Sequence, residues 1–420
     1  MIQTIQILPG ITLRCFPDNR FKQNCLSLQL IRPMCREEAA LNALIPAVLL
    51  RGCQAAPDLR SITLRLDDLY GASVGALVRR VGDYQTTGLS CSFISDKYAM
   101  DGDEILSPMI DFLGELLLQP VLEDGVFRRD YVRSEKKNLI STIESQLNDK
   151  RTYAVSQLIK TMCAADSFGI PRLGEVSQVK KITPRTAYDH YRKILRQSRI
   201  DIFYVGQASG ETVAAKLKAL FAPLDRDYVN LPEQTALYSI SAGEHTKTME
   251  IAQGKLAMGF VTPITTRCAD FAAMQVCNAV FGGGMTSKLF MNIRERMSLC
   301  YDISSGYHGS KGVVTVCAGI DCEKMSAVRD EILAQLENCR QGDITEEELT
   351  AAKQALMSSL RSTHDSPVAV ESYYATAALS GLSLTPAEYL HRVEQVTLQQ
   401  VSQAAQSLTL DTVYFLKGVS

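Results

Sequence analysis

The chain has 420 residues, of which 46% are hydrophobic and 21% charged, so it can form a sizeable core and is not disordered as a whole. Its 44 lysines and arginines against 46 aspartates and glutamates give a net charge of −2, which offers no basic excess for binding nucleic acid or an anionic membrane. No apolar run approaches the roughly 20 residues of a membrane span, and no basic stretch followed by an apolar one opens the chain, so we expect a cytoplasmic protein without a signal peptide.

Hydrophobic periodicity and turn signals divide the first half of the chain into strands and helices. The helix near residue 183 has a clear start, because Thr183 can cap it and Pro184 fits its first position. Strands are predicted at 10–16, 25–31, 76–81, 85–94 and 200–205, and helices at 37–51, 61–69, 103–118 and 126–148.

The second half repeats this order of elements. Strands are predicted at 255–262, 312–320 and 412–416, and helices at 269–281, 288–296, 325–339, 345–363 and 398–407. Local strings also match in order: 47–52 parallels 279–284, and 200–206 parallels 411–418. We therefore predict two copies of one α+β unit, a domain over 1–223 and a domain over 245–420, joined by a linker over 224–244 that is richer in Asp, Pro, Asn and Gly.

The twelve cysteines are scattered along the chain and form no C-x-x-C pair. Most lie within apolar runs, which predicts buried thiols in a reducing compartment and argues against a disulfide framework or a zinc ribbon.

The sharpest local motif lies in the second half and runs from a glycine triplet to a tyrosine. Its letters are Phe281-Gly282-Gly283-Gly284-Met285-Thr286-Ser287-Lys288-Leu289-Phe290, then Ile293-Arg294-Glu295-Arg296, then Leu299-Cys300-Tyr301. With the duplicated order of elements, this resembles the pitrilysin, insulinase and mitochondrial-processing-peptidase family, and the resemblance covers nearly the whole chain. It implies two homologous α+β domains, each a mainly antiparallel sheet packed with helices, that face each other as a clamshell. Active members of the family cleave peptides with a single zinc ion.

The zinc motif of active members, H-x-x-E-H, is lost in this chain. Two His four residues apart on a helix reach one metal ion, and the Glu between them acts as the general base. Counting back from the helix end at Arg51-Gly52, the resemblance places these positions at Ala43, Pro46 and Ala47, none of which can bind zinc or take a proton. The best interpretation of residues 43–50 is therefore a plain core helix.

Two further features bear on the metal. The family's third zinc ligand corresponds best to Glu135, which without its His partners is expected to lie on a solvated helix face. The alternative is that Glu135 pairs with Lys136, Lys137 or an arginine elsewhere in the chain. His391 has only a partial motif spacing and is expected to be an ordinary surface or core histidine. We therefore expect no cofactor in this chain and no activity of the chain alone.

The resemblance also assigns substrate contacts. Arg294 and Tyr301 match an Arg and a Tyr, seven residues apart, that hold the substrate backbone and the developing oxyanion in active members; the alternative is an exposed helix Arg beside a half-buried Tyr. The loop of Gly282, Gly283 and Gly284 either contacts substrate or simply ends a helix, and it lacks the spacing of a phosphate-binding loop.

The stretch of Gly75, Ala76 and Leu77 corresponds to an edge strand that captures extended peptides by strand addition. The alternative for this stretch is an ordinary hairpin strand whose charged residues protect its edge.

Together these features predict a non-catalytic subunit of a two-subunit zinc peptidase, which would contribute Arg294, Tyr301 and one wall of the substrate chamber to its partner. In this it is similar to a metal-less bacterial subgroup known as YfmF-like. Its partner would be a zinc-bearing relative in a heterodimer, with a homodimer left open, and its substrate a peptide or an unfolded protein. The subgroup links the chain weakly to the modification of elongation factor P. The alternative is an inactive scaffold or peptide-binding module; an independent zinc peptidase would require bound zinc in the purified chain.

Overall fold

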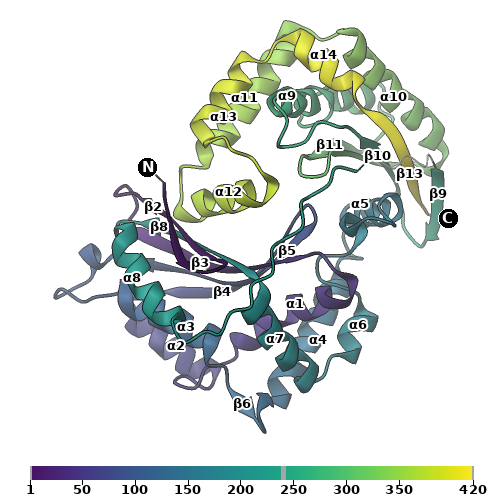
Figure 1. The fold of residues 1–420 in the computed structure, drawn as a ribbon. Coiled ribbons are helices and arrows are strands. Elements are labelled where there is room, and N and C mark those ends of the chain that lie inside the picture. The colour runs from purple at the N-terminus through teal and green to yellow at the C-terminus, as the bar shows by residue number, and fades with distance from the viewer. Residues whose placement is uncertain (1, 238–242, 419–420) are drawn as a thin grey trace. The chain divides into compact units, whose positions relative to one another are not determined.

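The structure is a computed structural model that describes residues 2–237 and 243–418 (Figure 1). Its internal contacts divide the chain into two compact units, and each is described by itself. Unit 1 consists of Met1–Glu144, Ile170–Glu233 and His364–Thr376, and unit 2 of Ser145–Gly169, Gln234–Thr363 and Ala377–Ser420.

Unit 1 is built on a sheet that has six strands among the described residues, in the order β1-β2-β8-β3-β5-β4. Strands β2 and β8 are parallel, and all other neighbours in this sheet are antiparallel. The strand bounds are β1 Gln3–Leu8, β2 Ile11–Pro17, β3 Gln23–Pro33, β4 Ser73–Val81, β5 Tyr84–Ile94 and β8 Arg199–Gly206, and a small separate hairpin is formed by β6 Leu122–Glu123 and β7 Val126–Phe127.

Helices cover this sheet on both sides. The central strand β3 alternates, so that Leu26, Leu28 and Leu30 enter the main hydrophobic core while Ser27 and Gln29 point to the opposite face. In Figure 1 helices α1, α3, α7 and α8 lie on one side of the sheet. The helices are α1 Arg36–Leu49, α2 Leu59–Asp68, η1 Asp96–Tyr98, α3 Leu106–Leu118, α4 Arg129–Ser145, α6 Val176–Lys181, α7 Pro184–Gln197 and α8 Gly210–Phe221.

Unit 2 is built on a sheet with five strands among its described residues, in the order β11-β12-β10-β13-β9. Only β13 and β9 are parallel within it. Its strands are β9 Gly243–Met249, β10 Gly254–Val261, β11 Asp302–His308, β12 Val313–Ile320 and β13 Thr409–Gly418, and its helices are η2 Ser167–Gly169, α9 Phe271–Phe281, the π-helix η3 Leu289–Arg296, η4 Cys322–Lys324, α10 Met325–Gln341, α11 Glu346–Ser362, α13 Pro386–Gln395 and α14 Leu398–Gln406.

The two sheets share one topology, which confirms the predicted duplication of an α+β fold. Read from β2, the first sheet runs β2-β8-β3-β5-β4, and the second runs β9-β13-β10-β12-β11 with the same sequence of one parallel and three antiparallel pairings. Strand β1 is an additional strand at the far edge of the first sheet.

Two helices pack on the sheet that the other half of the chain forms. Helix α5 (Lys150–Met162) comes from the first half, but its Ala154 and Leu158 pack against Ala257, Cys317 and Tyr414 of the second sheet. Conversely, helix α12 (Pro367–Ser380) comes from the second half, and its residues up to Thr376 belong to unit 1. The boundaries 1–223, 224–244 and 245–420 therefore stay a prediction about the duplicated sequence, and residues 238–242 of that linker lie outside the described residues.

Most expected elements are present, with informative differences at their ends. The helix expected over 103–118 begins at Leu106, because Asp96 Oδ1 accepts the backbone N–H groups of Ile105 and Leu106. The helix expected over 288–296 is a π-helix, a form that is rare and often found at functional sites. Helices α5, α12 and α13 and strands β1, β9 and β11 were not expected from the sequence.

All twelve cysteines lie in the described residues, and none forms a disulfide; all but Cys35, Cys268 and Cys322 are buried. Among the described residues no helix is both long and apolar enough to cross a membrane.

Candidate functional site

The helix that would carry a zinc motif, α1, holds three side chains without a metal donor. Ala43 is 6% exposed, Pro46 is buried in the helix interior, and Ala47 is partly buried. Proline has no N–H for the carbonyl four residues earlier, so the carbonyl of Asn42 loses its helical partner. Thr87 Oγ1 donates to this carbonyl at 2.6 Å, which compensates for the missing hydrogen bond.

A buried polar network anchors the same turn of α1. Asn42 Nδ2 donates to Gln85 Oε1 at 2.8 Å, and Asn42 Oδ1 lies 2.8 Å from Nε2 of His190 on α7. Since Asn42 Oδ1 can only accept, His190 carries its proton on Nε2. Burial lowers the pKa of His190 to about 4, so the imidazole is neutral near pH 7. The network fixes α1 structurally and gives no sign of a reactive group.

The expected third ligand, Glu135, is engaged by other side chains. Its carboxylate is 11% exposed, and its Oε1 lies 3.5 Å from Arg51 Nη1, while Asn138 Nδ2 donates to Oε2 at 3.1 Å. The Arg51 guanidinium also lies over the ring of Tyr131, 5.4 Å from its centre. Glu135 is therefore part of an ion pair, and the expectation of a solvated helix face is wrong in this detail.

These residues do not fit a zinc ion. Zinc in catalytic sites takes three protein donors from His, Cys, Asp or Glu, and here two methyl groups and a proline stand beside one carboxylate that already has a cationic partner. Within the described ranges, no group of three or more His, Cys, Asp or Glu side chains is placed to hold a metal. His391 is 66% exposed on α13 beside Gln395.

The segment with Arg294 and Tyr301 projects toward solvent. Arg294 lies on the π-helix η3; its guanidinium lies 4.6 Å from the centre of the Phe290 ring and 3.4 Å from Glu295 Oε1. Its charge also acts on the thiol of Cys300, whose pKa burial raises to about 11. Arg294 is thus near Cys300, the residue that precedes Tyr301.

Tyr301 already has a hydrogen-bond partner. It is 52% exposed, and its hydroxyl donates to Asp321 Oδ1 at 2.8 Å, while Asp321 Oδ2 pairs with Lys324 at 2.9 Å. The hydrogen bond to Asp321, and then its negative charge, raise the pKa of Tyr301, so the phenol keeps its proton at neutral pH. Tyr301 can serve as a donor to a ligand only if it leaves Asp321.

The three glycines of the loop at 282–284 differ in how closely other atoms pack around them. Gly282 ends α9, and its carbonyl accepts from Ser305 N at 2.8 Å; a side chain there would meet Leu289 Cδ1 at 2.7 Å. Gly283 and Gly284 are exposed, and a side chain at Gly284 would meet no other atom within 4 Å. Packing thus requires the first glycine, whereas the last one borders open space.

The stretch expected to bind peptide lies on β4, the terminal strand of the first sheet among the described residues. Gly75, Ala76 and Leu77 pair with Ser90, Leu89 and Gly88 of β5; Ala76 is exposed and Leu77 is buried. The opposite edge of β4 has no strand partner in the described part of the chain.

An ion pair braces this strand from the face that α12 covers. Arg79 of β4 donates to both carboxylate oxygens of Glu371, at 3.1 and 2.9 Å, and Glu371 is 1% exposed. Ser27 Oγ and Gln29 Nε2 of β3 donate to the same carboxylate at 2.8 and 2.5 Å. Glu371 therefore ties the edge strand to the centre of the sheet.

Comparisons with known proteins agree with this architecture. A family model described as "Peptidase M16 inactive domain" matches residues 181–356. The chain is 29% identical to the "Probable inactive metalloprotease YmfF" of Bacillus subtilis, covering 97% of this chain and 96% of that protein. It is 28% identical to the "Uncharacterized zinc protease YmxG" of the same organism, over 74% of this chain and 75% of that protein. A crystal structure of a conserved protein from Enterococcus faecalis superimposes with a TM-score of 0.94 and 28% identity, covering 100% of this chain and 99% of that one.

The fold is that of the M16-type peptidases, and the chain is similar over 97% of its length to a relative described as an inactive metalloprotease. This relative, which is named YmfF, represents the metal-less bacterial subgroup expected from the sequence.

Three residues that shape these sites were not found from the sequence: Arg51, Asp321 and Glu371. Arg51 lies one helical turn after Ala47, the last of the lost zinc positions. A cation at this place was a sequence signal for a charge partner of Glu135. No sequence signal marks Asp321 or Glu371, because their partners are brought to them by other elements of the fold.

Proposed function

We propose that the chain is the non-catalytic subunit of a two-subunit zinc peptidase, to which it contributes Arg294, Tyr301 and a wall of the chamber. The observation that carries this proposal is an asymmetry between two sites. The metal positions Ala43, Pro46 and Ala47 offer no donor, whereas the Arg294 and Tyr301 segment keeps its residue types and is exposed.

The proposed partner is a zinc-bearing relative. Bacillus subtilis has both a relative described as an inactive metalloprotease and one described as a zinc protease, which supports pairing of a metal-less with a metal-bearing chain. The ligand of the pair would be an extended peptide or an unfolded protein. An edge strand such as β4, with Gly75, Ala76 and Leu77, can pair with such a ligand through its backbone. In the other unit, the exposed glycines 283 and 284 offer a second contact for substrate. A heterodimer is proposed, with a homodimer as an outcome of the test, and a role in elongation factor P modification belongs to this proposal.

Chemically, the two donated side chains would act on the substrate. A guanidinium offers two parallel donors to a peptide carbonyl, and a neutral phenol offers one donor to an oxyanion. Tyr301 fits this role in charge state, since its raised pKa keeps the proton on the hydroxyl.

A second function is favoured by a specific observation. Tyr301 already donates to Asp321 and Arg294 already pairs with Glu295, so neither needs a substrate to satisfy it. This supports an inactive scaffold or peptide-binding module with no part in hydrolysis.

The test combines the purified chain with a purified zinc-bearing relative from the same genome and measures peptide cleavage. Loss of one oxyanion donor costs about 10²- to 10³-fold in rate, so Arg294→Ala and Tyr301→Phe should reduce cleavage by a factor of this order. Arg296→Ala, on the same helix, is the matched control, because Arg296 is exposed and bonds only to Asn292 among the described residues. A stable complex whose cleavage is indifferent to both substitutions would refute the donated residues and favour the scaffold.

The pathway is tested separately. A strain without this chain should accumulate elongation factor P of altered mass if the link holds, and unchanged elongation factor P would refute it.

A further inference from the structure

A strongly basic surface lies on the helical side of unit 1, although the whole chain carries a net charge of −2. Seven exposed cations on helices α4, α6 and α7 have no ion-pair partner within the described residues, and we call them the basic face: Arg129, Arg133, Lys137, Lys180, Lys181, Arg185 and Arg192. Carboxylates also lie on or beside these helices: Asp130, Glu135 and Glu144 on α4, Glu175 before α6, Asp189 on α7, and Glu123, whose Oε2 accepts the backbone N–H of Arg129 at 3.3 Å. Asp130, Glu135 and Glu175 are paired with arginines outside the basic face.

Side-chain contacts bring these helices together. Lys136 Nζ of α4 donates to the carbonyls of Lys180 at 2.9 Å and Ile182 at 2.5 Å, which places the end of α6 beside the middle of α4. Phe127, just before α4, contacts Tyr188 of α7 with ring centres 5.5 Å apart. These contacts bring the three helices that carry the cations together within unit 1.

Two features of the basic face run against the local stability of its helices. Arg129, Arg133 and Lys137 follow at intervals of four residues on α4, so like charges lie on one face and repel each other. Arg185 lies in the first turn of α7, where the helix dipole disfavours a cation and where no acidic residue is present to offset it. Because these charges destabilise the helices that carry them, the basic face is better explained by binding of a ligand than by a contribution to folding.

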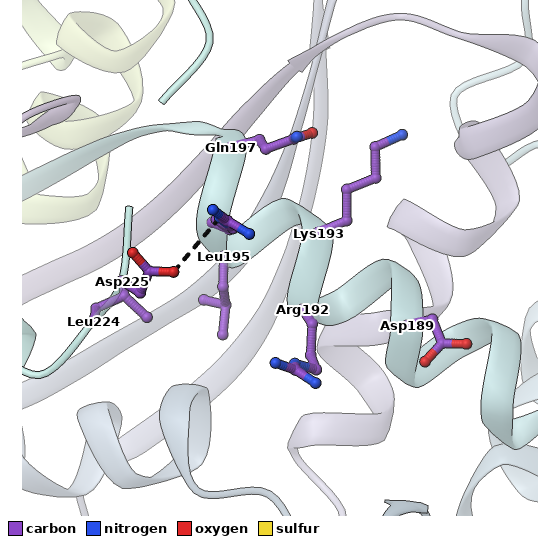
Figure 2. Close-up of a pocket in the computed structure, with 8 residues that line it drawn as sticks. Asp189, Arg192, Lys193, Leu195, Gln197, Leu224 and Asp225 are labelled. Carbon is purple, nitrogen blue, oxygen red and sulfur yellow. Dashed lines mark ion pairs between the residues drawn. The ribbon is translucent and has the colours of Figure 1, made fainter. Parts of the chain in front are cut away.

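The hollow at one end of this surface does not explain the cations. A cavity of about 550 Å³ on α7 is lined by Asp189, Arg192, Lys193, Leu195, Arg196, Gln197, Leu224 and Asp225 (Figure 2). Lys193 donates to Glu38 at 2.7 Å and Arg196 pairs with Asp225 at 3.7 Å, so these cations are compensated. Figure 2 also shows Arg192 and Lys193 leaving α7 in different directions, so they do not converge on one small ligand.

We propose that the basic face binds an acidic segment of another polypeptide, rich in Asp and Glu. Helices α4, α6 and α7 carry no exposed large hydrophobic side chain, so they offer neither a stacking surface for bases nor an anchor for a bilayer. A long polyanion would also extend from this face onto a chain of net negative charge, whereas a short acidic segment would not. The stripe from Arg129 to Lys137 is about 12 Å long at 1.5 Å per residue, which suits an extended segment rather than a single carboxylate.

The test measures fluorescence anisotropy of a labelled dodecaglutamate peptide with the full chain. Binding is expected at about 50 mM salt and should weaken strongly at about 200 mM, because exposed charges are screened over roughly 10 Å. The variant Arg129→Glu/Arg133→Glu/Lys137→Glu should bind at least about tenfold more weakly. The neutral variant Arg129→Gln/Arg133→Gln/Lys137→Gln, which removes a repulsion from α4, should bind at an intermediate level and guards against loss of folding as the cause.

The control variant is Lys216→Glu/Lys218→Glu on α8, where both lysines are exposed in the same unit. Its affinity should stay within about twofold of the unmodified chain. Equal loss in the α4 and α8 variants would overturn the proposal, as would failure of dodecaglutamate to bind at low salt. Tighter binding of a single-stranded DNA dodecamer or of phosphatidylserine vesicles, lost in the α4 variant, would overturn the choice of an acidic polypeptide.

Discussion

Replacing Glu371 by Gln tests how the edge strand β4 is held. The substitution keeps the shape of the side chain but removes its charge, and it places an NH₂ group where one carboxylate oxygen accepts from Arg79. Because Glu371 is 1% exposed and also receives Ser27 and Gln29, no water can replace the lost acceptor easily. Arg79 is 30% exposed, so its unpaired charge can partly reach solvent.

The substitution should lower the free energy of unfolding by less than the usual loss for a broken buried ion pair. Removing one partner of such a pair costs about 3–5 kcal/mol, and the partial exposure of Arg79 reduces this to about 2–3 kcal/mol. Since 1.4 kcal/mol is a factor of ten, protection of the amide hydrogens in β3 and β4 should fall roughly 30- to 140-fold.

Hydrogen exchange followed by mass spectrometry measures this loss strand by strand, and it does not require the two units to unfold together. Glu211→Gln is the matched control, because Glu211 is exposed on α8 of the same unit. Adding Arg79→Gln to Glu371→Gln should restore part of the protection, since no unpaired charge then remains. Unchanged exchange in β3 and β4 of Glu371→Gln would refute the view that this ion pair braces the edge strand.

Three further predictions concern other parts of the chain. Burial holds the pKa of His190 at about 4 in the folded chain, against 6.5 in the unfolded chain, so the folded state loses at most about 3 kcal/mol of stability as the pH falls from 6.5 to 4. Urea unfolding followed by circular dichroism at pH 7.5 and 5 should therefore show a smaller pH dependence of stability in His190→Gln than in the unmodified chain. An equal pH dependence in the two proteins would contradict this. The triple variant Ala43→His/Ala47→His/Arg51→Gln should bind zinc more tightly than the double variant Ala43→His/Ala47→His, because loss of Arg51 frees Glu135 from its ion pair. Isothermal titration calorimetry measures both affinities. Equal affinities would mean that the ion pair does not compete with zinc for Glu135. Of the twelve cysteines, Cys35, Cys268 and Cys322 should react with Ellman's reagent in the native chain well before the buried ones, and rapid reaction of all twelve would contradict the burial.

The sequence identified the family resemblance and the loss of the zinc ligands, because both depend on residue types at fixed spacing along one segment. Alternation of Leu26, Ser27 and Leu28 likewise predicted a strand, since neighbouring side chains point to opposite faces. The positions Ala43, Pro46 and Ala47 needed only a count along one helix, and the segment from Gly282 to Tyr301 only a short motif.

What the tertiary structure decided are the partners of these residues. The pairing of Arg51 with Glu135, of Tyr301 with Asp321 and of Arg79 with Glu371 joins residues from different elements, and helical or strand periodicity carries no information about such partners. The same holds for α5 and α12. Only the folded chain determines that each of these helices packs on the sheet formed by the other half.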